Sequence, residues 1–303
     1  MAARERSDLS LDAPRHLRVR HVTHFDYSDE IIDTTMELRL RPIDGDGQRL
    51  VSYNLVIDPR TSVRGFADPS GNWVDTWNYG GLHRAITIAT ESVVETGLPR
   101  LNGPPPPLSI GEDFAMRRFD GPILDLPLVR AIADRRPDLA SLDGLDAMTA
   151  DIHDRFEYQP SVTHVHSTVA DIVAHGRGVC QDFAHLWIAA CRARGIPARY
   201  VSGYIRNTVP IDGAPRPGAS HAWGEAWLPG SGWLGYDPTN WSIETRGRVR
   251  ADHVRVATGR DYRDVPPTRG IYRGTARESL SISVTVMDLD AVSSQAPEPF
   301  GRR

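Results

Sequence analysis

Four consecutive prolines, Pro104 to Pro107, divide this sequence more sharply than any other feature. Proline fixes φ and has no backbone N–H, so the run can continue neither a helix nor a central strand. A stiff, extended connection is expected instead. A chain of 303 residues is long enough for two domains. We therefore predict an N-terminal β domain at residues 16–100, a proline-rich linker at 101–120, a second domain at 121–290 and a flexible tail at 291–303.

The sequence before the prolines has the pattern of short β-strands. Apolar residues alternate with polar ones in the first two segments, and Val, Ile and Thr are frequent in the next two. Turn sequences rich in Asp and Gly occur at residues 44–47 and 68–72. The expected strands are residues 16–27, 35–41, 50–57 and 82–95. This arrangement predicts a small antiparallel β-sandwich.

The sequence after the prolines is first helical and then β. Gly195 and Pro197 mark the end of the last expected helix. Helices are expected at residues 126–135, 142–156, 167–175 and 179–194, the third capped by Ser167 or Thr168. Strands are expected at residues 199–205, 221–227, 233–236 and 279–287. Helices followed by an antiparallel sheet give the fold class α+β.

The composition excludes several kinds of chemistry. All 35 residues counted as Lys or Arg are Arg, so the chain has no lysine. A nucleotide-binding Walker A loop needs a lysine, and so does Schiff-base or pyridoxal chemistry. The net charge of −4 gives no basic surface for nucleic acid. We expect no cofactor, no nucleic-acid partner and no metal, and the oligomeric state is left open.

The two cysteines and the N-terminus indicate the compartment. Cys180 and Cys191 are too few for a disulfide framework, and on one helix they would lie about 16 Å apart along it. The first 16 residues are polar and rich in Arg, without the apolar stretch of a signal peptide. The longest apolar stretch, residues 183–191, is too short to span a bilayer. We expect a cytoplasmic protein without a membrane partner.

Cys180 is the first candidate for chemistry. It follows two glycines, at positions 176 and 178, and falls in the first turn of the expected helix at 179–194. The unpaired N–H groups and the positive end of the helix dipole favour a thiolate there. The same N–H groups can hold an oxyanion beside the sulfur. Taken by itself, a cysteine is more often a small core residue, and Cys191 fits that description.

His221 and Asp237 are the candidates for a base and its orienting acid. His221 opens one expected strand, and Asp237 ends the next, where Pro238 stops it. If the two strands form an antiparallel hairpin, the start of the first lies near the end of the second. A thiolate nucleophile needs such a pair. Glu225 lies on the same strand face as His221 but about 13 Å along it, so it ranks below Asp237 as the orienting acid.

Other residues carry weaker signals. His164 and His166, shortly before the nucleophile, could line the cleft, as could Gln181 beside it and Trp223 near the base. His164, His166 and His175 could also suggest a metal, but no metal-binding motif accompanies them. Tryptophans at 223, 227, 233 and 241 are more often core than a binding platform. The arginines Arg192, Arg194 and Arg199 are interpreted as a solvated face.

Several of these segments, in this order and spacing, resemble the transglutaminase-like superfamily of bacteria. The segments are Gly178-Val179-Cys180-Gln181-Asp182-Phe183-Ala184, Arg194-Gly195-Ile196-Pro197-Ala198-Arg199-Tyr200-Val201-Ser202-Gly203-Tyr204, His221-Ala222-Trp223 and Tyr236-Asp237-Pro238-Thr239. The N-terminal half, with its turn at residues 68–72, is similar to the β domain that precedes the core in a bacterial subgroup. The resemblance extends from about residue 16 to about residue 290.

The resemblance implies a papain-like core with a triad of Cys180, His221 and Asp237. It also implies acyl-thioester chemistry on a peptide or protein substrate, with an amine as a possible co-substrate. The superfamily includes cross-linking acyltransferases, thiol proteases, deamidases and amide-forming enzymes. Two alternatives to acyl transfer therefore stay open: a thiol protease or amidase that only hydrolyses, and an inactive peptide-binding module.

Overall fold

The N-terminal fold is organised by one long, bent strand. The computed structural model describes residues 13–45, 47–99, 105–136, 138–160, 162–206 and 219–293. Its first strand, β1 (Arg15–Leu38), is continuous where the sequence predicted two separate strands. The pairing register of β1 shifts between Asp26 and Ile31, and Asp33 has a positive φ of 56°. These irregularities interrupt the alternation of side chains, which is why the sequence pattern broke there.

The two halves of β1 belong to two packed sheets. The first half pairs with β5 (His83–Thr96) and β13 (Glu278–Asp288), and β5 also pairs with β2 (Arg49–Asp58). The second half pairs with β4 (Trp73–Tyr79) and β12 (Thr268–Arg273), and β4 with β3 (Val63–Ala67). All of these pairs are antiparallel. An apolar cluster that includes Phe25, Met36, Trp77 and Ile86 fills the sandwich.

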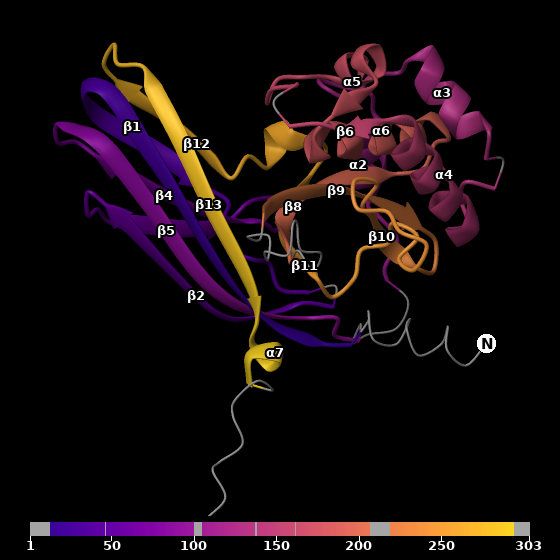
Figure 1. The fold of residues 1–303 in the computed structure, drawn as a ribbon, viewed down its shortest axis with the longest axis horizontal. Coiled ribbons are helices and arrows are strands. Elements are labelled where there is room, and N and C mark those ends of the chain that lie inside the picture. Colours follow the sequence, from indigo (N-terminus) through magenta and orange to yellow (C-terminus); the bar gives the residue numbers. More distant parts are fainter. Residues whose placement is uncertain are drawn as a thin grey trace, which may run out of the picture.

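The second part of the fold places helices against a four-stranded antiparallel sheet (Figure 1). Its strand order is β10-β9-β8-β11. The strands are β8 (Ala198–Ile205), β9 (Ala219–Leu228), β10 (Gly232–Tyr236) and β11 (His253–Gly259). The main helices are α3 (Pro127–Asp134), α4 (Leu142–Arg155), α5 (Val169–His175) and α6 (Cys180–Ala193), all close to their predicted bounds. A short parallel pair, β6 (Glu157–Tyr158) and β7 (Arg177–Gly178), precedes α6.

The central helix α6 is buried on nearly all sides. Its residues from Gln181 to Arg192 are buried, and it packs on the face of β9 that carries small residues. A Cβ on Gly224 would lie 2.4 Å from the ring of Trp187, so only glycine permits this close approach. The helix ends at Gly195, whose φ of +66° is the left-handed conformation expected there.

Arg192 corrects one expectation from the sequence. It was interpreted as part of a solvated face, but it is buried, with 4% of its surface exposed. Its guanidinium donates to the backbone carbonyls of Arg118, Ala198 and Arg260 at 2.6–3.3 Å. Burial lowers the pKa of Arg192 to about 10. The chain thus uses a buried cation to join the end of α6 to three other segments, a role that no local pattern indicates.

The C-terminal strands cross the predicted division of the chain. The strand expected at residues 279–287 is present as β13, but β12 and β13 pair with β1 and complete the first sandwich rather than the second sheet. The predicted linker likewise contains a helix, α2 (Ile110–Arg117). Ser109 and Glu112 form a capping box at its start, a signal that the sequence analysis missed. Residues 100–104 and 294–303 lie outside the described part.

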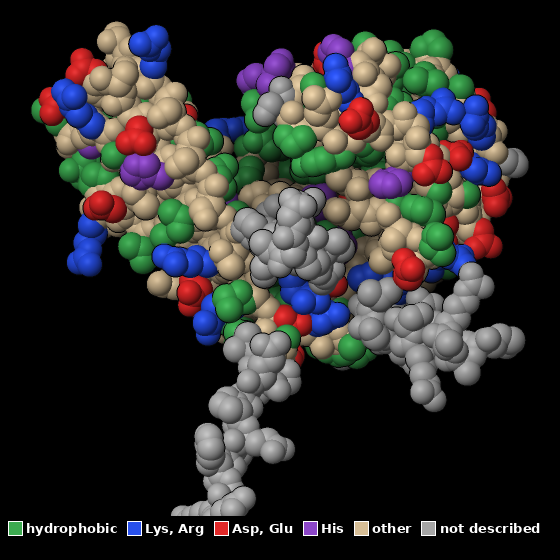
Figure 2. Space-filling view, viewed as in Figure 1, with side chains coloured by type: hydrophobic (Ala, Val, Ile, Leu, Met, Phe, Trp, Pro, Cys, Tyr) green, Lys and Arg blue, Asp and Glu red, His purple; other side chains and the backbone are tan. Residues whose placement is uncertain are grey.

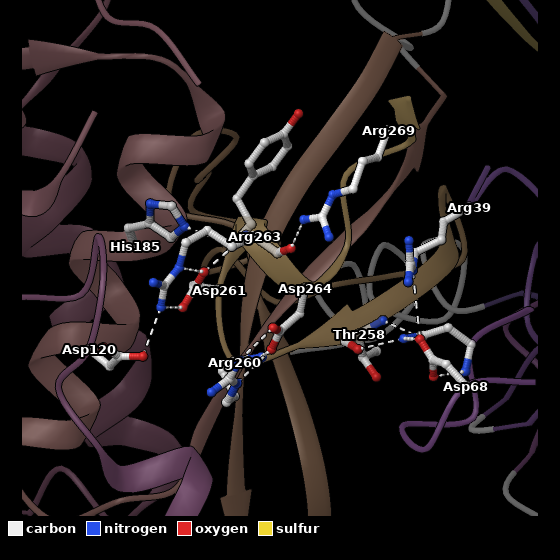
Figure 3. A network of polar contacts seen from close by, with 12 residues as sticks. Arg39, Asp68, Asp120, His185, Thr258, Arg260, Asp261, Arg263, Asp264 and Arg269 are labelled. Carbon is white, nitrogen blue, oxygen red and sulfur yellow. Dashed lines mark hydrogen bonds and ion pairs between the residues drawn. The ribbon is translucent and has the colours of Figure 1, made fainter. Parts of the chain in front are cut away.

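Polar contacts connect the sandwich to the end of β11, and further contacts fix the segment that follows β11 (Figure 3). Asn72 donates to the carbonyl of Thr258 at 2.9 Å and accepts from its N–H at 2.7 Å. Farther along, Arg263 donates to Asp261 and Asp120, each at 2.9 Å. Between the two parts the surface is hollowed on the face shown in Figure 2, and apolar side chains line the hollow. Among the described residues, no helix is long and apolar enough to cross a membrane.

Candidate active site

Cys180 is the first residue of α6, as the sequence predicted. Val179 adopts extended geometry as the N-cap, and its N–H donates to Asp182 Oδ2 at 2.8 Å. The same carboxylate oxygen accepts from the hydroxyl of Thr163 at 2.6 Å. A Cβ on Gly178 would lie 2.8 Å from the Asp182 side chain, so glycine is needed beside this cap. Cys180 is partly exposed, whereas Cys191 is buried, and both are free thiols.

His221 and Asp237 come together through the predicted hairpin. Strands β9 and β10 pair antiparallel, with Tyr236 opposite Gly224. Asp237 follows β10 and reaches back toward the start of β9. Its Oδ2 lies 2.7 Å from Nε2 of His221, and both side chains are buried. With Nε2 facing the acid, Nδ1 is the ring nitrogen left for the thiol, and the nearby Cys180 side chain contributes to raising the pKa of His221.

The charges of this pair reinforce each other. Burial by itself would lower the pKa of His221, but the Asp237 carboxylate, and to a smaller extent Cys180, raise it to about 10. Burial would likewise raise the pKa of Asp237, but the charge and hydrogen bond of His221, together with His253, hold it well below its usual range. At neutral pH the pair is therefore an imidazolium beside a carboxylate.

Two residues that the sequence analysis missed complete the surroundings of Asp237. Asn240 Nδ2 donates to Asp237 Oδ2 at 2.8 Å and lies 3.1 Å from Nε2 of His221. The N–H groups of Thr239 and Asn240 donate to Oδ1 at 3.0 and 3.3 Å. His253, at the start of β11, places Nε2 3.2 Å from Oδ2. The Asp-Pro turn could have suggested Asn240, since Asp at a turn accepts from the N–H groups that follow it.

Glu225, the rejected alternative for the acid, has other partners. It is fully buried and accepts from Arg199 at 2.6 Å and from Arg255 at 2.8 Å. Burial would raise the pKa of Glu225, but the two guanidinium groups lower it to about 2. Glu225 is thus a fixed anion that holds two arginines. The interpretation of Arg199 as solvated is wrong for the same reason.

The weaker candidates lie at different distances from this cluster. Gln181 is buried, and its amide donates to the carbonyl of Val165 at 3.2 Å, so it holds the segment that carries His164 and His166. The latter two are exposed, and among the described contacts they pack edge-on against each other rather than on the cluster. Trp223 is fully buried, with its ring centroid 6.2 Å from that of His221.

Three of these side chains could in principle hold a metal ion. His221, Asp237 and His253 each offer one ligand atom, and the three atoms lie within 4.8 Å of one another. Metal-binding histidines donate their second ring N–H to an acceptor. Nδ1 of His253 instead accepts from the N–H of Arg250 at 3.3 Å. This places the hydrogen on Nε2, so the cluster suits hydrogen bonding to Asp237 better than metal binding.

Comparisons with known proteins agree with this fold. The family model "Transglutaminase-like superfamily" matches residues 129–238, and "Bacterial transglutaminase-like N-terminal region" matches residues 17–95. An uncharacterized protein of Mycobacterium tuberculosis is 32% identical over 96% of this chain and 98% of its own length. Another, of Mycobacterium leprae, is 32% identical over 90% of this chain and 99% of its own.

These matches define the class, and the chain belongs to the transglutaminase-like superfamily. More particularly, it carries the superfamily core behind a bacterial transglutaminase-like N-terminal region. A structure from Cytophaga hutchinsonii, described as a proposed cysteine protease, has a TM-score of 0.72 and 21% identity and covers 96% of this chain and 95% of its own. The expected fold class, an N-terminal antiparallel β-sandwich before a papain-like core, is thereby confirmed.

One matching relative is named for an activity. A protein-glutamine gamma-glutamyltransferase of Pseudomonas aeruginosa is 28% identical over 55% of this chain and 26% of its own length. Its activity belongs to that much longer protein. For this chain, the superfamily membership supports the coarser description of a fold whose members are usually cysteine enzymes.

Proposed function

We propose that the protein is a cysteine acyltransferase that forms a thioester on Cys180 from an amide or peptide donor. The observation that carries the proposal is the buried contact of His221 with Asp237 at 2.7 Å, together with Cys180 at the start of α6, near enough to His221 to raise its pKa. Each member has the residue type and the place that nucleophilic catalysis requires. The start of α6 adds backbone N–H groups beside the sulfur.

The first half of the reaction makes the thioester. His221 holds the proton taken from Cys180, and Asp237 keeps the imidazolium oriented. The thiolate sulfur attacks the amide carbonyl carbon, and the oxygen takes up the negative charge beside the N–H of Cys180. The C–N bond then breaks, and the leaving nitrogen takes the proton from His221. Ammonia or an amine departs, and the acyl group stays on sulfur.

The second half resolves the thioester. An incoming amine or water gives a proton to His221 as its nitrogen or oxygen attacks the carbonyl carbon. The C–S bond breaks and regenerates the thiolate. The same residues serve both acceptors, so what decides the outcome is which molecule reaches the thioester. The matching gamma-glutamyltransferase and the complete absence of lysine, which leaves no side-chain amine on this chain to acylate, favour an amine acceptor.

A test of the acceptor needs one peptide and two conditions. A glutaminyl peptide is incubated with the protein, with and without a saturating primary amine, and the products are weighed by mass spectrometry. Acyl transfer predicts the amine adduct with loss of ammonia. If only the water product forms at saturating amine, the protein is a thiol hydrolase, the alternative that the proposed-protease description of the Cytophaga hutchinsonii structure suggests.

The inactive peptide-binding module is tested by the reactivity of the thiol itself. An ion pair of Cys180 with His221 predicts fast alkylation by iodoacetamide at pH 6, mapped to Cys180 by peptide mass spectrometry. Cys191 is the matched control, because burial raises its pKa well above the ordinary value. Slow labelling of Cys180, no faster than a free thiol at that pH, would favour the inactive module.

The two free cysteines also support a reducing, cytoplasmic location.

A further inference from the structure

His253 contacts the same oxygen of Asp237 that His221 contacts, but from another strand, and the proposed reaction does not use it. It opens β11, which pairs with β8 and not with the β9–β10 hairpin. Its side chain is 8% exposed. Nδ1 accepts from the N–H of Arg250 at 3.3 Å, so the neutral ring carries its hydrogen on Nε2. That hydrogen points to Asp237 Oδ2 at 3.2 Å.

The segment around His253 is held by the N-terminal sandwich. Gln48 accepts from the N–H of Arg255 at 2.8 Å and donates to its carbonyl at 2.9 Å. On the other side of His253, the hydroxyl of Thr96 donates to the carbonyl of Ala251 at 2.5 Å. Side chains of the N-terminal domain therefore hydrogen-bond to the backbone at Ala251, two residues before His253, and at Arg255, two residues after it.

We propose that His253 is a positioning residue for the catalytic acid, and that the N-terminal β domain supports the active site through it. Asp237 Oδ1 is fixed by two backbone N–H groups from its own turn. Oδ2, the oxygen that faces His221, depends on side chains for its other hydrogen bonds, namely Asn240 and His253. A donor anchored from outside the hairpin keeps this buried carboxylate ionised and aimed at His221. This inference rests on the proposed function of the triad.

A cavity beside His253 fits this arrangement. It has a volume of about 350 Å³ and is lined by Gln48 and Thr96 from the sandwich and by Trp223 and His253 from the core. The other charged groups on its wall are arginines, at positions 248, 250 and 255. Arg248 is paired with Asp146 and Arg255 with Glu225. Asp237 and His221 are the charged groups that face His253 directly.

The test compares two replacements of similar size. His253→Gln keeps an N–H donor with similar reach, whereas His253→Leu removes it. The readout is the rate of Cys180 alkylation at pH 6 divided by the rate at pH 9.5, where any thiol ionises without help. Loss of a charge-assisted hydrogen bond predicts a fall of about tenfold in this ratio for Leu. Gln should recover most of it. A packing role predicts equal ratios for Gln and Leu, which would overturn the proposal.

The link to the sandwich is tested with a mutant cycle. Gln48→Met and Thr96→Val together remove the hydrogen bonds to Arg255 and Ala251 with little change in side-chain size. We expect the ratio of the alkylation rates at pH 6 and pH 9.5 to fall about threefold, as for a weakened hydrogen bond. In the His253→Leu background the same pair should have no further effect. An equal fall in both backgrounds would refute transmission through His253.

The wild-type protein separates this inference from the proposed function. If its Cys180 reacts at pH 6 no faster than a free thiol, the triad itself has failed. If the wild-type ratio is high and His253→Leu leaves it unchanged, the triad stands and the positioning role of His253 is wrong. Thermal melting of each variant confirms that the compared proteins are folded.

Discussion

Replacing Asp237 by asparagine should remove the charge that keeps His221 protonated. In the wild type the pKa of His221 is raised from 6.5 to about 10 against the effect of burial. This difference corresponds to about 5 kcal/mol of stabilisation of the imidazolium. An amide at position 237 supplies no charge, so burial then dominates. In Asp237→Asn we expect the pKa of His221 to fall below 6.5.

Two assays measure this change. NMR titration of labelled histidine, with His221 assigned by comparison with a His221→Gln spectrum, should show a protonated ring through pH 9 in the wild type. In Asp237→Asn the ring should titrate below pH 6.5. Alkylation of Cys180 at pH 6 should slow by about 100-fold or more, because an unassisted thiol is only ~0.3% ionised at that pH. If His221 still stays protonated at pH 8 in the variant, the electrostatic account of the site is wrong.

The same substitution should also cost stability, which the experiment must separate from chemistry. Asp237 accepts three side-chain contacts at Oδ2 and two N–H groups at Oδ1. Whichever way an asparagine amide turns, its NH₂ faces donors. We expect a loss of about 1–3 kcal/mol for each donor left unpaired. Asp237→Asn is therefore assayed well below its melting temperature, with circular dichroism as the check on folding.

Three further outcomes are expected. Cys180→Ala should abolish thioester formation in a folded protein, whereas Cys191→Ala should keep it; loss of activity in folded Cys191→Ala alone would reverse the assignment. Arg192→Leu should lower the free energy of unfolding by about 3 kcal/mol, measured with urea, because three backbone carbonyls, one buried and two partly buried, lose their donor. The melting advantage of wild type over Asp237→Asn should depend on pH. Since the pKa of Asp237 is lowered and that of His221 raised, the pair stabilises fully between their unfolded values of 3.8 and 6.5. This advantage should decline as pH falls below that window or rises through about 10, and a pH-independent advantage would contradict it.

The residues that the sequence could identify share a place at the ends of elements. Cys180 follows glycines at a helix start, and Asp237 precedes the proline that ends a strand. Such positions have local signals, because glycine and proline control where helices and strands stop. One short turn between β9 and β10 then brings His221 to Asp237. The contact needed no long-range information, so hairpin logic was enough to predict it.

The residues that the sequence did not reveal depend on contacts between distant segments. The sequence around Arg192 does not distinguish it from an exposed helical arginine. Its burial depends on the carbonyls of Arg118 and Arg260, which are distant in the sequence. The return of β12 and β13 to β1 is of the same kind, since alternation predicts a strand but not its sheet. The proline run marked a real change in pattern, but it could not show that the C-terminal strands β12 and β13 return to pair with β1 of the N-terminal sandwich.

That return has a consequence for the site. Because β12 and β13 complete the sandwich, the strands of the sandwich come from both before and after the transglutaminase-like core in the sequence, and the core is tied to the sandwich at both ends. Leu17, Val19 and Val94 of the sandwich share one apolar cluster with Trp187 and Tyr236 of the core. Gln48 and Thr96 extend this shared packing to the start of β11, where His253 contacts Asp237. Removing the N-terminal domain would therefore expose this shared apolar cluster and remove the side chains that hold the start of β11 beside Asp237, so the two parts form one structural unit.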